Sequence, residues 1–272
     1  MKDRVEYKRS GEIPGLMLSE ARFSDFRFER HYHLDYHIAL VTDGVQRQAF
    51  HGETLLLAPG SIQLMPPGEV HDGISGGDES YTLKTFRVSP RLLGGITEEI
   101  TGQDRFPALG AAVLRDSRLA GHLSRLHGAL QKGKNAEPME VQSEWLMLLD
   151  RLFSQTRMVR PQFVKGTLAP VQWRCVRDYC DVHLAEKITL EELAALCGLE
   201  RFHFLKLFKR TAGMTPHAWL VRLRLERACA LLGQTGQNLT QVAQEVGFYD
   251  QSHFNRAFRQ AFCVSPSQYW RP

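Results

Sequence analysis

Short runs of alternating apolar and polar residues, interrupted by glycine and proline, fill roughly the first ninety positions of the chain. Clear examples are residues 36–41 (YHIALV), 54–57 (TLLL) and 61–65 (SIQLM). Such runs are typical of β-strands that bury one face and are joined by tight turns. The pattern predicts a β-rich N-terminal domain.

Helical periodicity follows the β-rich part. Four leucines recur at intervals of four, three and four residues from Leu119 to Leu130, which places them on one face of a helix. A second apolar helix is predicted after Pro138. These helices could pair with a second subunit or cover the outer face of the β-domain, and we favour dimerisation.

A segment with two prolines, one glycine and little periodicity precedes the last hundred residues, and it is typical of a linker. The predicted fold class is therefore α+β with two domains. We expect an N-terminal domain at 1–160, a linker at 161–170 and an all-helical domain at 171–272.

The helical domain contains an internal repeat with a spacing of 49 to 50 residues. The repeated pairs are Leu190 and Leu239, Ala194 and Ala243, Gly198 and Gly247, Phe204 and Phe254, Phe208 and Phe258, Pro216 and Pro266, and Trp219 and Tyr269. The offset changes by one residue just after the glycine, where a turn can absorb it. Two copies of one structural unit are the simplest interpretation.

Each copy has the sequence signals of a helix, a tight turn and a second helix. Thr189 with Glu192, and Asn238 with Gln241, are capping-box pairs at the start of a short helix. The glycine at the end of that helix suits a left-handed C-cap. This geometry is that of a helix-turn-helix, whose second helix enters the DNA major groove, although plain helical hairpins share it.

The charge distribution favours DNA over a plain helical bundle. Residues 171–272 hold 13 Lys/Arg against 9 Asp/Glu, which accounts for the whole net charge of +4. The five cysteines form no Cys-x-x-Cys pair, so neither a disulfide framework nor a zinc knuckle is indicated. Apolar runs are too short for a bilayer and the N-terminus is not a signal peptide, so we expect a cytoplasmic protein without a membrane partner.

These residues resemble the AraC/XylS family of bacterial transcription regulators over about the last hundred positions. The matching features include Phe208-Lys209, Gly213, Gly247-Phe248 and the run Ser265-Pro266-Ser267. Glu200 and Cys263 depart from the family's usual small capping residue and glycine. The resemblance implies that the double-stranded DNA is read at two successive major-groove faces about 34 Å apart. It also implies a homodimer, and contact with RNA polymerase if the chain is an activator.

Helical periodicity assigns the DNA-facing positions, which point away from the paired phenylalanines. On the first recognition helix they are Arg201, Phe202, Leu205, Lys206 and Lys209, and on the second they are Gln251, Ser252, Asn255, Arg256 and Arg259. Arg, Asn and Gln make bidentate contacts to base edges, whereas Leu and Phe meet only thymine methyl groups. A solvated helix face is the alternative for each charge taken singly.

The N-terminal domain carries a second pattern: His31, His33 and His37, then Gly60, and later a Pro-Pro-Gly turn before His71. Its spacing resembles the two motifs of the cupin barrel, with His37 where metal-binding cupins usually carry glutamate. The first three histidines share parity, so in one strand they would point to one face.

Three interpretations of His31, His33, His37 and His71 stay open. They bind a small-molecule effector, they hold a divalent metal, or some of them are structural. We favour a ligand-responsive transcription regulator that is not an enzyme and has no certain cofactor. The alternatives are a metal-dependent, dioxygenase-like cupin enzyme or a metal sensor, each fused to a DNA-binding domain.

Overall fold

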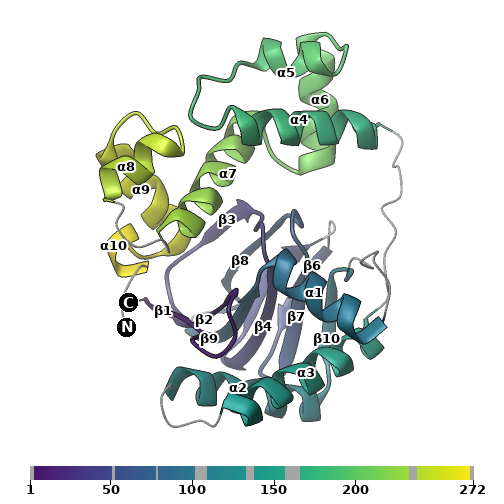
Figure 1. Cartoon of the computed structure of the whole chain (residues 1–272), viewed down its shortest axis with the longest axis vertical. Coiled ribbons are helices and arrows are strands. Elements are labelled where there is room, and N and C mark those ends of the chain that lie inside the picture. The colour runs from purple at the N-terminus through teal and green to yellow at the C-terminus, as the bar shows by residue number, and fades with distance from the viewer. Residues whose placement is uncertain are drawn as a thin grey trace. The chain divides into compact units, whose positions relative to one another are not determined.

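The chain divides into two compact units, Met1–Arg160 and Pro161–Pro272, in the computed structural model shown in Figure 1. The structure describes residues 3–50, 53–77, 79–101, 109–132, 138–156, 166–232 and 238–269. The first unit is β-rich and the second is helical, as the hydrophobic pattern predicts. No helix in these ranges combines the length and the apolar character needed to cross a membrane.

Two antiparallel sheets form the first unit. The strands are β1 (Arg4–Arg9), β2 (Leu16–Phe23), β3 (Phe28–His31), β4 (Tyr36–Asp43), β5 (Gln46–Phe50), β6 (Glu53–Leu57), β7 (Ser61–Met65), β8 (His71–Ser75), β9 (Tyr81–Val88) and β10 (Ala112–Arg115). The larger sheet has the order β1-β2-β9-β4-β7-β10, and the smaller has the order β3-β8-β5-β6. A hydrogen bond of 2.6 Å from Gln63 Nε2 on β7 to Gln46 Oε1 on β5 joins the two facing sheets.

The described part of this unit also contains three helices: α1 (Pro90–Thr101), α2 (Ser117–Lys132) and α3 (Pro138–Gln155). In Figure 1, α2 and α3 lie along the large sheet. The apolar residues of one sheet face, such as Ile38 and Phe86, share a core with the helices. At the start of α2, Asp116 accepts hydrogen bonds from the backbone nitrogens of Arg118 and Leu119, while its second oxygen accepts from Arg151 on α3.

The leucine stripe from Leu119 to Leu130 is helical as predicted, but its proposed role in dimerisation is wrong. All four leucines are at most 4% exposed and belong to the core between helices and sheet. Burying a leucine side chain stabilises the fold by about 1.5–3 kcal/mol. Packing this stripe on the apolar face of the sheet buries both surfaces within the same chain. The alternative interpretation, that the helices cover the β-domain, is the one the structure supports.

The second unit repeats one arrangement of helices. Its elements are α4 (Pro170–Val182), α5 (Leu190–Leu196), α6 (Arg201–Ala212), α7 (Pro216–Leu231), α8 (Leu239–Glu245), α9 (Gln251–Phe262) and α10 (Pro266–Tyr269). Both predicted capping boxes form, Thr189 with Glu192 and Asn238 with Gln241. The turn glycines, Gly198 (φ 64°) and Gly247 (φ 82°), are left-handed. The internal repeat is thus a pair of helix-turn-helix units, α5–α6 and α8–α9.

Equivalent aromatic residues hold each recognition helix. The rings of Phe208 and Trp219 lie 5.9 Å apart in the first helix-turn-helix, and those of Phe258 and Tyr269 lie 5.3 Å apart in the second. Both phenylalanines are fully buried. Because these anchors fix one face of α6 and of α9, the opposite face is free to meet another molecule.

Candidate nucleic-acid interface and effector site

The outer faces of α6 and α9 carry the side chains that the sequence assigns to DNA. Seven of the ten are exposed: Arg201, Phe202, Lys206, Lys209, Ser252, Arg256 and Arg259. The other three, Leu205, Gln251 and Asn255, are half-buried. The helical period therefore places most of the assigned residues outward, and it overstates the exposure of three.

The first residue of each recognition helix is held by the preceding helix. Arg201 Nη1 lies 2.9 Å from Glu191 Oε1, and Gln251 Oε1 accepts a hydrogen bond of 3.1 Å from Thr240 Oγ1. These are equivalent positions of the repeat. The contact is an ion pair in the first helix-turn-helix and a hydrogen bond between neutral groups in the second. Both contacts are exposed and individually weak, which leaves Arg201 and Gln251 able to exchange partners for DNA.

Asn255 is placed differently from the prediction. Its Oδ1 atom is buried and has no hydrogen-bond partner within the described residues. An amide that turns this oxygen inward presents only part of its hydrogen-bonding capacity to a base edge.

Periodicity alone missed several exposed side chains on the same surfaces. Tyr249, just before α9, is 94% exposed, which exceeds even the 80% of Phe202, the most exposed large apolar residue that the prediction includes. Arg210 and Gln260 are equivalent exposed residues, each following the last assigned position of its helix. Arg210 and Gln260 lie 50 residues apart, so the offset of the repeat pairs them and could have added them to the prediction. Tyr249 precedes the helix, so helical periodicity does not predict its exposure.

The helix α7 connects the two helix-turn-helix units through Arg224. Its guanidinium donates to the carbonyl oxygens of Leu184 (3.0 Å) and Glu186 (2.8 Å), in the loop between α4 and α5. A side chain at Gly247 would meet both the Leu184 oxygen and the guanidinium, at 2.4 and 2.9 Å from its Cβ. The turn between α8 and α9 therefore packs directly on the hydrogen bonds between Arg224 and the loop that precedes α5.

The four histidines converge inside the β-unit, although by another route than shared parity in one strand. His31 ends β3 in the small sheet, His33 lies in the following loop and His37 is on β4 in the large sheet. The chain crosses from one sheet to the other between them, so the parity argument does not apply. The turn before His71 contributes as expected, because the Gly68 backbone nitrogen donates to the His33 carbonyl oxygen at 2.8 Å.

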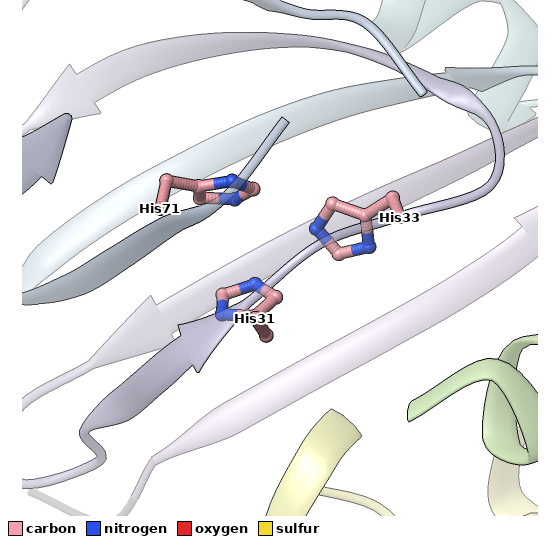
Figure 2. A group of neighbouring side chains, drawn as sticks. All are labelled: His31, His33 and His71. Carbon is pink, nitrogen blue, oxygen red and sulfur yellow. The ribbon is translucent and has the colours of Figure 1, made fainter. Parts of the chain in front are cut away.

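The rings of His31, His33 and His71 face a common centre, as Figure 2 shows. Their centroids are separated by 4.9 Å (His31 to His33), 4.4 Å (His31 to His71) and 5.2 Å (His33 to His71). His37 stacks on His33 at 3.5 Å with an interplanar angle of 14°. His33 and His71 are 9% and 8% exposed and are largely shielded from water, whereas His31 and His37 are half-buried.

Further polar side chains occupy the space between the sheets. Gln46, Gln48 and Gln63 are at most 4% exposed, and the Gln48 Oε1 atom has no partner within the described residues. Arg87 is 8% exposed and pairs with Asp35 at 2.6 Å. Burying polar groups is costly unless they are hydrogen-bonded, so an interior of this kind is suited to a polar guest.

A separate cavity of about 560 Å³ lies on the other side of the small sheet. Its lining consists of Arg27, Phe28, Glu29, Arg30, Arg47, Ala49, Thr54, Asp72 and Ile74. Along β5 and β8 these residues alternate with the inward-facing glutamines and His71, so they point outward. None of the four histidines lines this cavity, and no sequence motif predicts it.

Comparisons with known proteins define the class of both units. The model of the AraC-like ligand binding domain matches residues 13–149, and that of a helix-turn-helix domain matches residues 193–271. The chain is thus a DNA-binding transcription regulator with a ligand-binding domain. It belongs to the AraC family, whose ligand-binding model covers half of its length.

Individual relatives are transcription regulators that the chain matches over most of their length. The chain is 27% identical to the uncharacterized HTH-type transcriptional regulator YbfI of Bacillus subtilis, over 88% of this chain and 86% of that protein. It is also 27% identical to the MmsAB operon regulatory protein of Pseudomonas aeruginosa, over 91% of this chain and 79% of that protein. Crystal structures of ToxT from Vibrio cholerae share the fold; one with an unsaturated fatty acid bound has a TM-score of 0.62 at 13% identity, covering 96% of each chain.

Proposed function

We propose that a small polar effector, bound among the buried histidines, controls DNA binding by α6 and α9. The observation that supports DNA binding is the matching set of exposed cationic side chains on α6 and α9. Lys206 with Lys209, and Arg256 with Arg259, project from equivalent exposed positions while the phenylalanine pairs are buried. Cationic groups at one spacing on two matched helices suit the phosphates and guanine edges of two successive major-groove segments.

The two helices then divide the recognition between them. Arg256 and Gln251 on α9 offer hydrogen-bonding groups that discriminate bases, whereas Phe202 and Leu205 on α6 offer apolar contacts to thymine methyl groups. Lys209 supplies charge that acts on any sequence. On this proposal the second helix-turn-helix, α8–α9, provides most of the hydrogen-bonded discrimination between bases.

The polar interior sets the chemistry of the effector. ToxT holds an unsaturated fatty acid in one crystal structure, but the space between the sheets here is bordered by His33, His71 and Gln48. An acyl chain offers these groups no hydrogen-bond partner, and a buried polar group left unsatisfied costs about 1–3 kcal/mol. We therefore propose a small hydrogen-bonding molecule in place of a long acyl chain.

We further propose that the chain acts in the cytoplasm as a homodimer without catalytic activity, and that it contacts RNA polymerase when it activates a promoter. The face of α3 turned away from the sheet carries Leu146 and Met147, which are 40% and 63% exposed. A second copy of the chain is the partner that we assign to this face. Sedimentation should show a dimer that Met147→Glu weakens, and a monomeric wild type would contradict the assignment.

The proposed function is tested with the full-length protein in two binding assays. Fluorescence anisotropy on duplex DNA should show a dissociation constant that rises steeply with salt. Lys209→Ala should reduce the salt slope by about one unit, whereas Arg118→Ala, a matched exposed substitution on α2, should leave it unchanged. Absence of DNA binding even at low salt would overturn the proposal.

The effector half is tested by thermal-shift screening of polar metabolites, since a ligand that binds only the folded state raises the melting temperature. A ligand that shifts the wild type should not shift His33→Ala or His71→Ala, and both variants should still bind DNA. A normal shift in both variants would exclude the histidine cluster as the effector site.

A further inference from the structure

Three imidazole groups meet in one place within the first unit. His31, His33 and His71 each bring a ring nitrogen to within 4.8 Å of the other two (Figure 2). They come from the end of β3, from the loop after it and from the start of β8, so three separate segments of the chain converge. Across the described residues this is the group of metal-binding side chains close enough to share one ion.

Hydrogen bonds to the backbone fix which nitrogen of two rings carries the proton. Nδ1 of His31 lies 2.7 Å from the carbonyl oxygen of Glu29, and Nδ1 of His71 lies 3.0 Å from that of Glu69. A carbonyl oxygen only accepts, so each Nδ1 must be the donor. In the neutral ring Nε2 then carries the lone pair, which is how metal-binding histidines are oriented by their surroundings.

His37 takes part in another way. Its ring is nearly parallel to that of His33 at 3.5 Å, and its nitrogens are not among those that converge. Stacking at this distance restrains the orientation of the His33 ring. His37 is therefore a positioning residue for the cluster, in contrast to the ligand position that the cupin motif would assign to it.

We propose that His31, His33 and His71 bind one divalent transition-metal ion of the zinc, nickel or cobalt class. Three neutral imidazoles favour such ions over magnesium or calcium, which prefer oxygen ligands. Bonds from nitrogen to metal of about 2.0–2.1 Å put two ligand atoms roughly 3–3.5 Å apart, so nitrogens that now lie within 4.8 Å of one another need to close by up to about 1.3–1.8 Å. Small rotations about the side-chain torsions of the three histidines would supply this movement.

Three protein ligands leave a coordination position open, as in metal sites that bind a further molecule. The ion would then present that position to the effector in the space between the two sheets. This inference deepens the proposed effector site, and it rests on the proposed function only for that last step. Metal binding is measured on the protein alone, so its failure would leave DNA binding untouched.

The test is titration of the metal-stripped, full-length protein with Zn²⁺ in competition with a chromophoric chelator. One equivalent should bind per chain, and His71→Gln, which keeps most of the side-chain volume, should weaken binding by at least about tenfold. His31→Ala should act in the same direction. The matched control is His217→Ala, an exposed histidine on α7, which should bind Zn²⁺ as the wild type does.

His37→Phe separates positioning from coordination, because phenylalanine keeps a flat ring for stacking but has no nitrogen. We expect it to retain zinc affinity within about threefold, and a loss as large as that of His71→Gln would overturn the assigned ligands. Visible absorption of Co²⁺ in the wild type provides a readout that needs no variant. Circular dichroism confirms that each variant is folded, and no stoichiometric binding by the wild type would overturn the proposal.

Discussion

The turn between α8 and α9 accepts only glycine, for two separate physical reasons, and replacing Gly247 by alanine tests both. Its φ of 82° lies in the left-handed region, and a Cβ there would lie 2.4 Å from the Leu184 carbonyl oxygen. Gly198 is the matched control, because its φ of 64° is also left-handed but nothing lies within 4 Å of a built Cβ. The same substitution at the two glycines therefore separates backbone strain from packing.

The magnitudes follow from these contacts. A left-handed alanine costs about 1–2 kcal/mol, while the smaller conformational freedom of unfolded alanine returns about 0.4–1 kcal/mol. Gly198→Ala should thus destabilise by about 1 kcal/mol. Gly247→Ala must in addition displace the Leu184 oxygen and the guanidinium of Arg224, and loss of their hydrogen bond adds about 1.5–3 kcal/mol.

The assay is unfolding of the full-length variants in urea, followed by circular dichroism at the transition of the helical unit. Gly247→Ala should lower the free energy of unfolding by about 2 kcal/mol or more beyond Gly198→Ala. For a unit of about a hundred residues this difference corresponds to a melting temperature lower by roughly 8–16 °C. Equal losses at the two glycines would refute the contact between the second turn and the Arg224 hydrogen bonds.

Three further predictions concern other parts of the chain. Burial lowers the pKa of His127 from 6.5 to about 4. Between these pH values the unfolded state binds more protons, so the free energy of unfolding should fall by about 3 kcal/mol as the pH drops. His127→Gln should flatten this pH dependence in urea titrations. Cys263 is left-handed (φ 62°) where Gly213 occupies the equivalent turn, so Cys263→Gly should stabilise by about 1 kcal/mol, and a loss of stability would contradict the strain. Arg256→Ala should cost about 1–3 kcal/mol of binding to the preferred DNA site, and an unchanged affinity would remove Arg256 from the interface.

The helical unit could be predicted in detail because its signals are local. A capping box such as that of Thr189 and Glu192 involves residues three apart, and the spacing of Phe204 and Phe208 is set by one helix turn. The repeat doubled each signal. Side-chain orientation is a different matter: the buried Oδ1 of Asn255 depends on neighbouring helices, which a periodic pattern does not encode.

The β-rich unit could be predicted only in outline. The histidines were expected to converge, but on the premise of a shared strand, whereas the chain passes between sheets after His31. The strand β10 has only four residues and pairs with β7 at the sheet edge, so its local pattern is too short to predict. The partner of the Leu119 stripe was predicted wrongly because an amphipathic helix specifies that it is covered, and not by what.

Binding-site selection with the full-length protein tests the central claim most directly, namely that one chain reads DNA with two matched helices. Randomised duplexes should yield, for each copy of the chain that binds, a motif in two parts whose centres lie about 10–10.5 base pairs apart, one helical turn. Repeating the selection with Arg256→Ala should relax the preference at a single base pair in one part and preserve the other. A motif with only one part, or an Arg256→Ala selection identical to that of the wild type, would contradict the account.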